Sequence, residues 1–230
     1  MAKMSERAKR LAGDASARGW RYSPTGEELE LPARWKWSVG IEHPFRYGSG
    51  GTGPTASSPA NDLIAGSSRA GRRFWAFWTP YLISGGGSGT GPRPTRCVAF
   101  IAAGKPLPTV SATSRRSVAR PYMSKLGQWA ARRAEKRSGS QADVNPRLDG
   151  WPIGSEAFRR QYKVEADDRH HAEWLLGSAT QEQLLTDPSI SLSTNGVDIL
   201  AWCDRGVGGD GFDMATVDAL LEVLDTVELP

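Results

Sequence analysis

Two acids and two histidines stand together in the stretch FRRQYKVEADDRHHAEWLL, residues 158–176. Asp167, Asp168, His170 and His171 are of the types that bind metal ions or move protons, and the chain has only 3 histidines. On a helix Asp167 and His171 would share a face, because they are four residues apart. One helix supplies two ligands at most here, so a third would have to come from elsewhere in the chain.

This cluster supports two hypotheses. The first is a metal-dependent hydrolase centred on His170 and His171. The second is that the histidines pack beside Trp174 or face water, and we expect this one because no HExxH motif or nearby third histidine completes a metal site. We therefore expect no metal and no cofactor.

The other familiar chemical motifs are missing from the sequence. Glycine-rich stretches cover residues 48–60 and 84–94, but no GKS or GKT follows them, and no GxSxG is present. GVGGDGFDM, residues 206–214, matches a single calcium-binding nonapeptide, and such sites need stacked copies. Cys97 and Cys203 belong to no CxxC pair, so we expect two small buried residues on strands rather than a disulfide framework. No catalytic residue can be assigned.

A basic segment at residues 115–137 is the candidate for nucleic-acid binding. It sets eight basic residues against one Glu, with Tyr122 and Trp129 between them. An anionic membrane surface would fit the same charges, and so would a solvated helix broken by Pro121 and Gly127. The basic residues are Arg115, Arg116, Arg120, Lys125, Arg132, Arg133, Lys136 and Arg137.

Basic residues are concentrated in the first half of the whole chain, and acidic residues in the second half. Residues 1–137 hold 23 Lys and Arg against 8 Asp and Glu, whereas residues 138–230 hold 6 against 17. If the two halves interleave in the fold, their charges neutralise each other. If they segregate, the first half presents a basic face to nucleic acid, lipid or an acidic partner.

The length and hydropathy pattern indicate one domain over residues 1–230. The N-terminus lacks the apolar core of a signal peptide, and no run approaches the ~18 apolar residues of a transmembrane segment. We therefore expect a cytoplasmic protein.

The predicted elements must position these residues, and they indicate an α+β fold. Residues 1–18 predict a basic helix that Gly19 ends. Strands at 62–66 and 72–83 form a hairpin, and the second has apolar side chains on both faces. TRCVAFIAA, residues 95–103, pairs with it, and the two prolines of KPLPTV, residues 105–110, end this part of the sheet.

The second half of the chain predicts a strand, a hairpin and several helices. FRRQYKVEA, residues 158–166, alternates like a strand, and Asp167 or Asp168 caps a helix after it. A helical turn, SATQEQLL, precedes a hairpin at Asn195-Gly196. Asp213 caps a last helix with an apolar stripe, formed by Met214, Val217, Leu220, Leu221, Leu224 and Val227.

We therefore expect a single α+β domain, in which an antiparallel sheet is packed with helices that come mainly from the C-terminal part. The glycine- and serine-rich stretches 48–60 and 84–94 are predicted to be flexible loops, and 138–155 a linker or insertion.

A succession of motifs resembles a known group of proteins. GWRY is followed by NDLIAG, AGRRFWAFWTPY, CVAFIAAGKPLPTV and EAFRRQYKVEADDRHHAEWLL, and then by the NG hairpin and the last helix. In this order they resemble a family of uncharacterised proteins of actinobacteria or their phages. The resemblance implies one α+β body, which in that family often follows transmembrane helices, and it transfers no catalytic residue.

The sequence thus favours a cytoplasmic binding or interaction protein with no recognisable active site and a protein partner still to be identified. Nucleic-acid binding through residues 115–137 and the hydrolase centred on His170 and His171 are the alternatives.

The nucleic-acid alternative predicts that the protein retains DNA or RNA and that retention weakens as salt is raised. Replacing Arg132, Arg133, Lys136 and Arg137 by neutral residues should lower that retention, because released counterions supply the affinity. A filter-binding assay over a salt series measures it. Absence of retention at every salt concentration would exclude this alternative.

Overall fold

A computed structural model of the chain describes residues 4–24, 29, 61–80, 94–115, 152–194, 197–207 and 213–229. Its helices are α1 (Glu6–Ala17), α3 (Glu156–Gln161), α4 (Arg169–Leu175), α5 (Ser178–Thr186) and α6 (Met214–Thr226). Its strands are β1 (Arg21–Ser23), β2 (Asn61–Ser67), β3 (Arg73–Pro80), β4 (Pro94–Ala102), β5 (Val110–Ser114), β6 (Tyr162–Ala166), β7 (Ile190–Thr194) and β8 (Asp198–Val207). They form a single α+β domain, as predicted.

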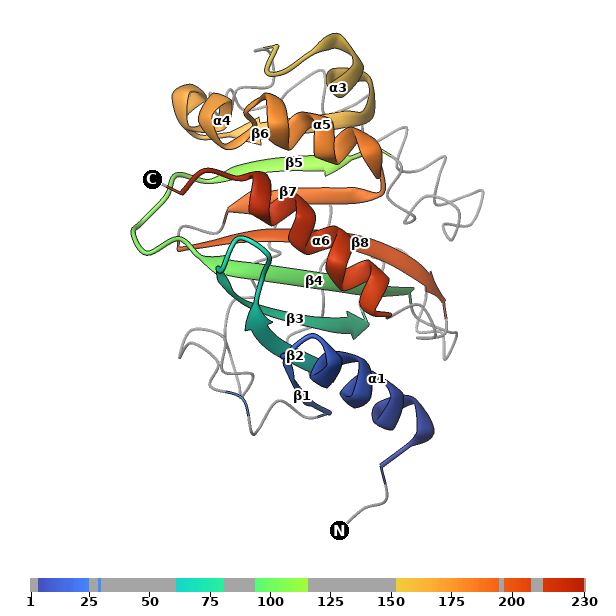
Figure 1. Cartoon of the computed structure of the whole chain (residues 1–230). Coiled ribbons are helices and arrows are strands. Elements are labelled where there is room, and N and C mark those ends of the chain that lie inside the picture. The colour runs from blue at the N-terminus through green and yellow to red at the C-terminus, as the bar shows by residue number, and fades with distance from the viewer. Residues whose placement is uncertain are drawn as a thin grey trace.

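The strands form one 8-stranded antiparallel sheet in the order β1-β2-β3-β4-β8-β7-β5-β6 (Figure 1). Strands β1 to β4 make up one half of the sheet, and β5 to β8 make up the other. The halves meet where β4 pairs with β8, from Pro94 opposite Val207 to Ala102 opposite Asp198. This β4–β8 pairing is called the seam below.

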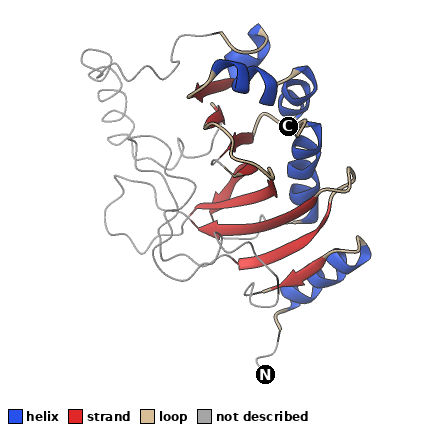
Figure 2. Cartoon of the chain, turned by 90° about the vertical axis from the view of Figure 1, so that its left-hand side faces the viewer, coloured by secondary structure: helices blue, strands red, loops and turns tan. Residues whose placement is uncertain are grey.

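The described helices all lie on one face of the sheet (Figure 2). Helix α6 packs against β4 and β8 across the seam, with Asp213 as its N-cap, and its predicted apolar stripe is buried. Helix α1 contributes Ala8, Leu11 and Ala15 to the core. The predicted apolar stripe of the last helix and its acidic cap are therefore confirmed.

The opposite face of the sheet also carries buried aromatic side chains. Trp75 on β3 stacks on Phe100 of β4 at 5.3 Å between ring centroids, and Phe77 meets the same ring edge-on. Because β3 lies between β2 and β4 and is buried on both faces, the prediction of a central or doubly covered strand is confirmed.

The prolines of KPLPTV follow the end of β4, as predicted, but a strand that the sequence pattern did not predict begins at the last residue of this stretch. Pro106 and Pro108 lie before β5, and Val110 begins a strand between β7 and β6. A proline at 108 removes no ladder hydrogen bond from a strand that starts two residues later, so the break falls in the connection and not in the sheet.

The strand predicted over residues 158–166 begins later than its pattern suggested. Residues 156–161 form the short helix α3, and only Tyr162–Ala166 is a strand. Ser155 caps the helix by accepting a hydrogen bond from the backbone N–H of Phe158 at 3.2 Å. Phe158 and Tyr162 are four apart, so they stack at 4.6 Å across the helix end, a spacing that resembles strand alternation in a short window.

Three elements, α1, β1 and β3, contact the carboxylate of Asp62 on β2. Tyr22 of β1 and Trp78 of β3 each donate a hydrogen bond of 2.5 Å to it, and the Arg7 guanidinium of α1 lies 3.1 Å away. Asp62 itself has φ 53° at an irregularity in the β2–β3 pairing, a left-handed conformation that aspartate tolerates better than most residues. This carboxylate therefore fastens α1 and β1 to the edge of the sheet.

Burial raises the pKa of Tyr22 above its ordinary value of about 10, and the hydrogen bond and charge of Asp62 raise it further. A raised folded-state pKa stabilises the fold below pH ~10, and that contribution is lost as the pH rises beyond it. The free energy of unfolding of the native chain should therefore fall more steeply above pH ~10 than that of Tyr22→Phe. Urea unfolding at a series of pH values measures this. Parallel curves for both chains up to pH ~11 would contradict the raised pKa.

Candidate binding cleft

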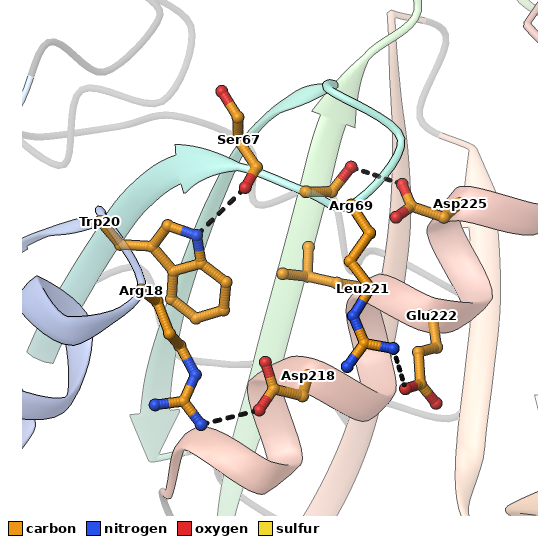
Figure 3. A pocket seen from close by; sticks show the side chains of 9 residues that line it. Arg18, Trp20, Ser67, Arg69, Asp218, Leu221, Glu222 and Asp225 are labelled. Carbon is orange, nitrogen blue, oxygen red and sulfur yellow. Dashed lines mark hydrogen bonds and ion pairs between the residues drawn. The ribbon is translucent and has the colours of Figure 1, made fainter.

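A cleft of about 390 Å³ opens between the end of α1, the turn that joins β2 to β3, and α6 (Figure 3). Its volume falls at the lower end of the range of ligand pockets. It is lined by Arg18, Trp20, Ser67, Ser68, Arg69, Asp218, Leu221, Glu222 and Asp225, and these residues define what we call the cleft.

The indole of Trp20 forms one wall of the cleft. Gly19, with φ 71°, ends α1 in the left-handed conformation and turns the chain toward β1, as its position in the sequence predicted. The indole N–H then donates to the Ser67 carbonyl at 3.0 Å, and the ring meets Phe74 edge-on at 5.0 Å. A Cβ atom at position 66 would lie 2.4 Å from the ring, so Gly66 is needed for this placement.

The turn between β2 and β3 is fixed to α6 through Asp225. This carboxylate accepts hydrogen bonds from the Ser68 hydroxyl at 2.5 Å and from the backbone N–H of Ala70 at 3.1 Å. Arg72 donates to the Leu224 carbonyl at 2.7 Å. Since Asp225 is occupied in this way, it serves to hold the turn and is not available for a ligand.

Two ion pairs lie at the rim of the cleft (Figure 3). Arg18 contacts Asp218 at 3.0 Å, with side chains 35% and 32% exposed, and Arg69 contacts Glu222 at 3.2 Å, with side chains 83% and 44% exposed. Ion pairs this exposed contribute about 0–1 kcal/mol, because water competes for both charges. A ligand with charged groups can therefore exchange with either pair at little cost.

A second, more open pocket of about 500 Å³ adjoins the cleft and shares Arg18, Trp20 and Ser67 with it. Among the described residues it is lined by Arg18, Arg21 and Arg73 and by no acidic side chain. The acids of the cleft all stand on α6. The surface around Trp20 is therefore acidic along α6 and basic where α1 ends and β1 begins, at Arg18 and Arg21.

The structure separates the conspicuous histidines of the sequence. His170 is exposed, whereas His171 packs against Trp174 at 4.7 Å between ring centroids. Burial lowers the pKa of His171, so its neutral form is favoured. Asp168 is the N-cap of α4 and accepts from the backbone N–H of His171 at 2.6 Å. The expectation that these histidines pack beside Trp174 or face water is confirmed.

No three His, Cys, Asp or Glu side chains within the described ranges lie close enough to hold a metal ion. Within the described residues, the hydrolase hypothesis centred on His170 and His171 therefore lacks the third ligand that a metal site needs.

Of the basic segment 115–137, the structure describes only Arg115, an exposed residue directly after β5. The other predicted nucleic-acid contacts, Arg116, Arg120, Lys125, Arg132, Arg133, Lys136 and Arg137, lie outside the described residues.

Sequence reasoning did not identify the cleft. Its one local signal is on the last helix, where Asp218, Glu222 and Asp225 recur at helical spacing along one border of the apolar stripe. The other wall comes from residues about 150 to 200 positions earlier in the sequence, and no periodicity connects segments that far apart.

Among the described residues, no helix combines the length and apolar character that crossing a membrane requires.

No family model matches the chain, and no curated protein matches it. A search of solved structures finds the crystal structure of the mycobacterial trehalose monomycolate transport factor A, TtfA, with 14% sequence identity and a TM-score of 0.49 over 95% of this chain and 90% of that one. A superposition this loose assigns no function to the chain.

The ion pairs at the rim of the cleft should contribute less to stability than the hydrogen bonds that Asp225 accepts from the β2–β3 turn. Asp218→Asn and Arg69→Ala are expected to change the free energy of unfolding by less than about 1 kcal/mol, because both ion pairs are exposed. Asp225→Ala should cost about 1–3 kcal/mol, because the Ser68 hydroxyl and the Ala70 N–H lose their acceptor. Urea unfolding of the three variants gives the order. Equal losses would show that Asp225 does not hold the turn.

Proposed function

We propose that this chain is a binding protein, and that it holds a charged segment of a protein partner in the cleft. The observation that carries the proposal is the indole of Trp20, which forms one wall of a cleft whose rim holds two exposed ion pairs. Such a wall binds an apolar side chain of the partner, while the ion pairs at the rim recognise charged side chains next to it. The expectation from the sequence, a binding protein with a protein partner, is narrowed here to one surface.

The residue types of the cleft support a protein partner. Tryptophan and arginine are the side chains most enriched where protein interfaces gain their affinity. Trp20, Arg18 and Arg69 supply both types within one surface. Trp20 is held by a hydrogen bond and by an aromatic contact, so little side-chain entropy is lost when a partner covers it.

The distribution of charge favours a peptide over a nucleic acid at this surface. A polyanion would meet the carboxylates of Asp218 and Glu222 along α6, and like charges at a contact oppose binding. A peptide segment with side chains of both signs meets no such conflict. Its acidic groups would face Arg18 and Arg69, and its basic groups would face the carboxylates of α6.

The proposal predicts a partner whose binding depends on the cleft. The biotin-labelled full chain is used to retain proteins from a host lysate, and each retained protein is then purified and titrated by calorimetry. Trp20→Ala should weaken its binding by at least about 10-fold, the scale of an interface residue that carries much of the affinity. Arg160→Ala is the control, because Arg160 forms an exposed ion pair with Glu156 on α3 and lies outside the cleft.

A double variant that exchanges the two charges of the Arg69–Glu222 ion pair distinguishes an effect on partner binding from an effect on folding. In Arg69→Glu combined with Glu222→Arg, the ion pair within the protein is kept and only its direction is reversed. The fold should be unchanged in circular dichroism, and partner affinity should still fall. Retained proteins that bind Trp20→Ala and the exchanged chain as tightly as the native chain would refute the proposal, as would retention only through nucleic acid that nuclease removes.

A further inference from the structure

The only two cysteines of the chain, about 100 residues apart, face each other across the seam. Cys97 of β4 stands directly opposite Cys203 of β8 in the antiparallel register. Both side chains are about 1% exposed and belong to the core beneath the helices. We propose that this pair is a site of reversible disulfide formation, and that the bond ties the two halves of the sheet together.

The backbone already provides the required geometry. Residues directly opposite in an antiparallel pair have Cα atoms about 4.5–5.5 Å apart, and disulfides span about 4.4–6.8 Å. Both side chains project from the same face of the sheet, as their shared core shows. The next pair along that face, Ala99 opposite Ala201, is small, so the sulfur atoms can turn toward each other without displacing a large neighbour.

The oxidant is a low-molecular-weight disulfide, and the reaction is thiol–disulfide exchange. The thiolate of one cysteine attacks the small disulfide, whose sulfur–sulfur bond breaks and releases one small thiol. The thiolate of the other cysteine then attacks the mixed disulfide at the protein sulfur, forming the Cys97–Cys203 bond and releasing the second small thiol. The two protons lost by the protein are taken up by the two released thiols, so the reaction balances.

Access to the site requires the seam to open. Because both thiols are buried, a small disulfide reaches them only during local openings of the fold, and exchange is expected to be slow in the native protein. Once formed, the bond closes a loop of about 100 residues and restricts the unfolded chain, which favours the folded state. It also joins the two strands on which α6, the acidic wall of the cleft, is packed.

The test incubates the full chain with oxidised and reduced glutathione in graded ratios. We expect intact mass to fall by about 2 Da per chain, for the two hydrogens removed, and digestion to yield a peptide that joins Cys97 to Cys203. The urea midpoint should rise by on the order of 1 M relative to the reduced chain, with an unchanged far-ultraviolet circular dichroism spectrum.

A register control keeps the number of thiols constant. Combining Cys203→Ala with Ala201→Cys places the second thiol diagonally from Cys97, where Cα atoms are about 7–8 Å apart, beyond the reach of an unstrained disulfide. This variant should instead acquire glutathione adducts. The proposal is overturned if the native chain acquires only glutathione adducts, or if the diagonal variant forms the disulfide as readily as the native chain. It is also overturned if disulfide formation changes the far-ultraviolet circular dichroism spectrum, because the bond would then disrupt the sheet.

Discussion

The pairing of β4 with β8 is the interaction on which the rest of the molecule depends. It joins strands β1–β4 to β5–β8, and α6 lies across it. The seam also contains a buried ion pair, Arg96 with Asp204 at 2.8 Å, and the Arg96 guanidinium lies 3.8 Å from the ring centroid of Trp202. A buried ion pair adds little net stability, but removing either partner is costly because the other charge stays desolvated. The pair therefore disfavours registers in which Arg96 and Asp204 do not meet.

The cleft forms only because the β4–β8 pairing brings the two halves of the chain together. Arg18, Trp20 and the β2–β3 turn come from the basic half of the chain, and the acids of α6 come from the other half. The sequence left open whether the charges of the two halves segregate or interleave. Arg18–Asp218, Arg69–Glu222 and Arg96–Asp204 all link one half to the other, so within the described residues the halves interleave where they meet. The carboxylate of Asp62, which fastens α1 to the sheet, keeps the basic wall of the cleft in place.

Much of the fold follows from sequence patterns within short segments, whereas the cleft is formed by residues that are far apart in the sequence. The N-cap Asp213 and the apolar stripe of α6, the β7–β8 hairpin and the strand β3, which is buried on both faces, are each determined by residues within a dozen positions of one another. Strand β5 does not follow from the sequence pattern, because the two prolines before it are typical of a break in a sheet. Helix α3 does not follow either, because a four-residue spacing in a short window resembles strand alternation. The cleft could not be predicted, since Arg18 and Asp218 lie 200 residues apart and meet only through tertiary packing.

The seam also bears on how the chain reaches its fold. The β2–β3 and β7–β8 hairpins close between neighbouring segments, whereas β4 and β8 must find each other across about 100 residues. Contacts of such high sequence separation slow folding, because loop-closure entropy is lost before the contact forms. Until they meet, each half of the sheet has an unpaired edge, and a slip of one residue on pairing would turn the side chains of one strand to the opposite face. We therefore expect register selection at the seam, rather than strand formation, to set how long the chain is exposed to aggregation.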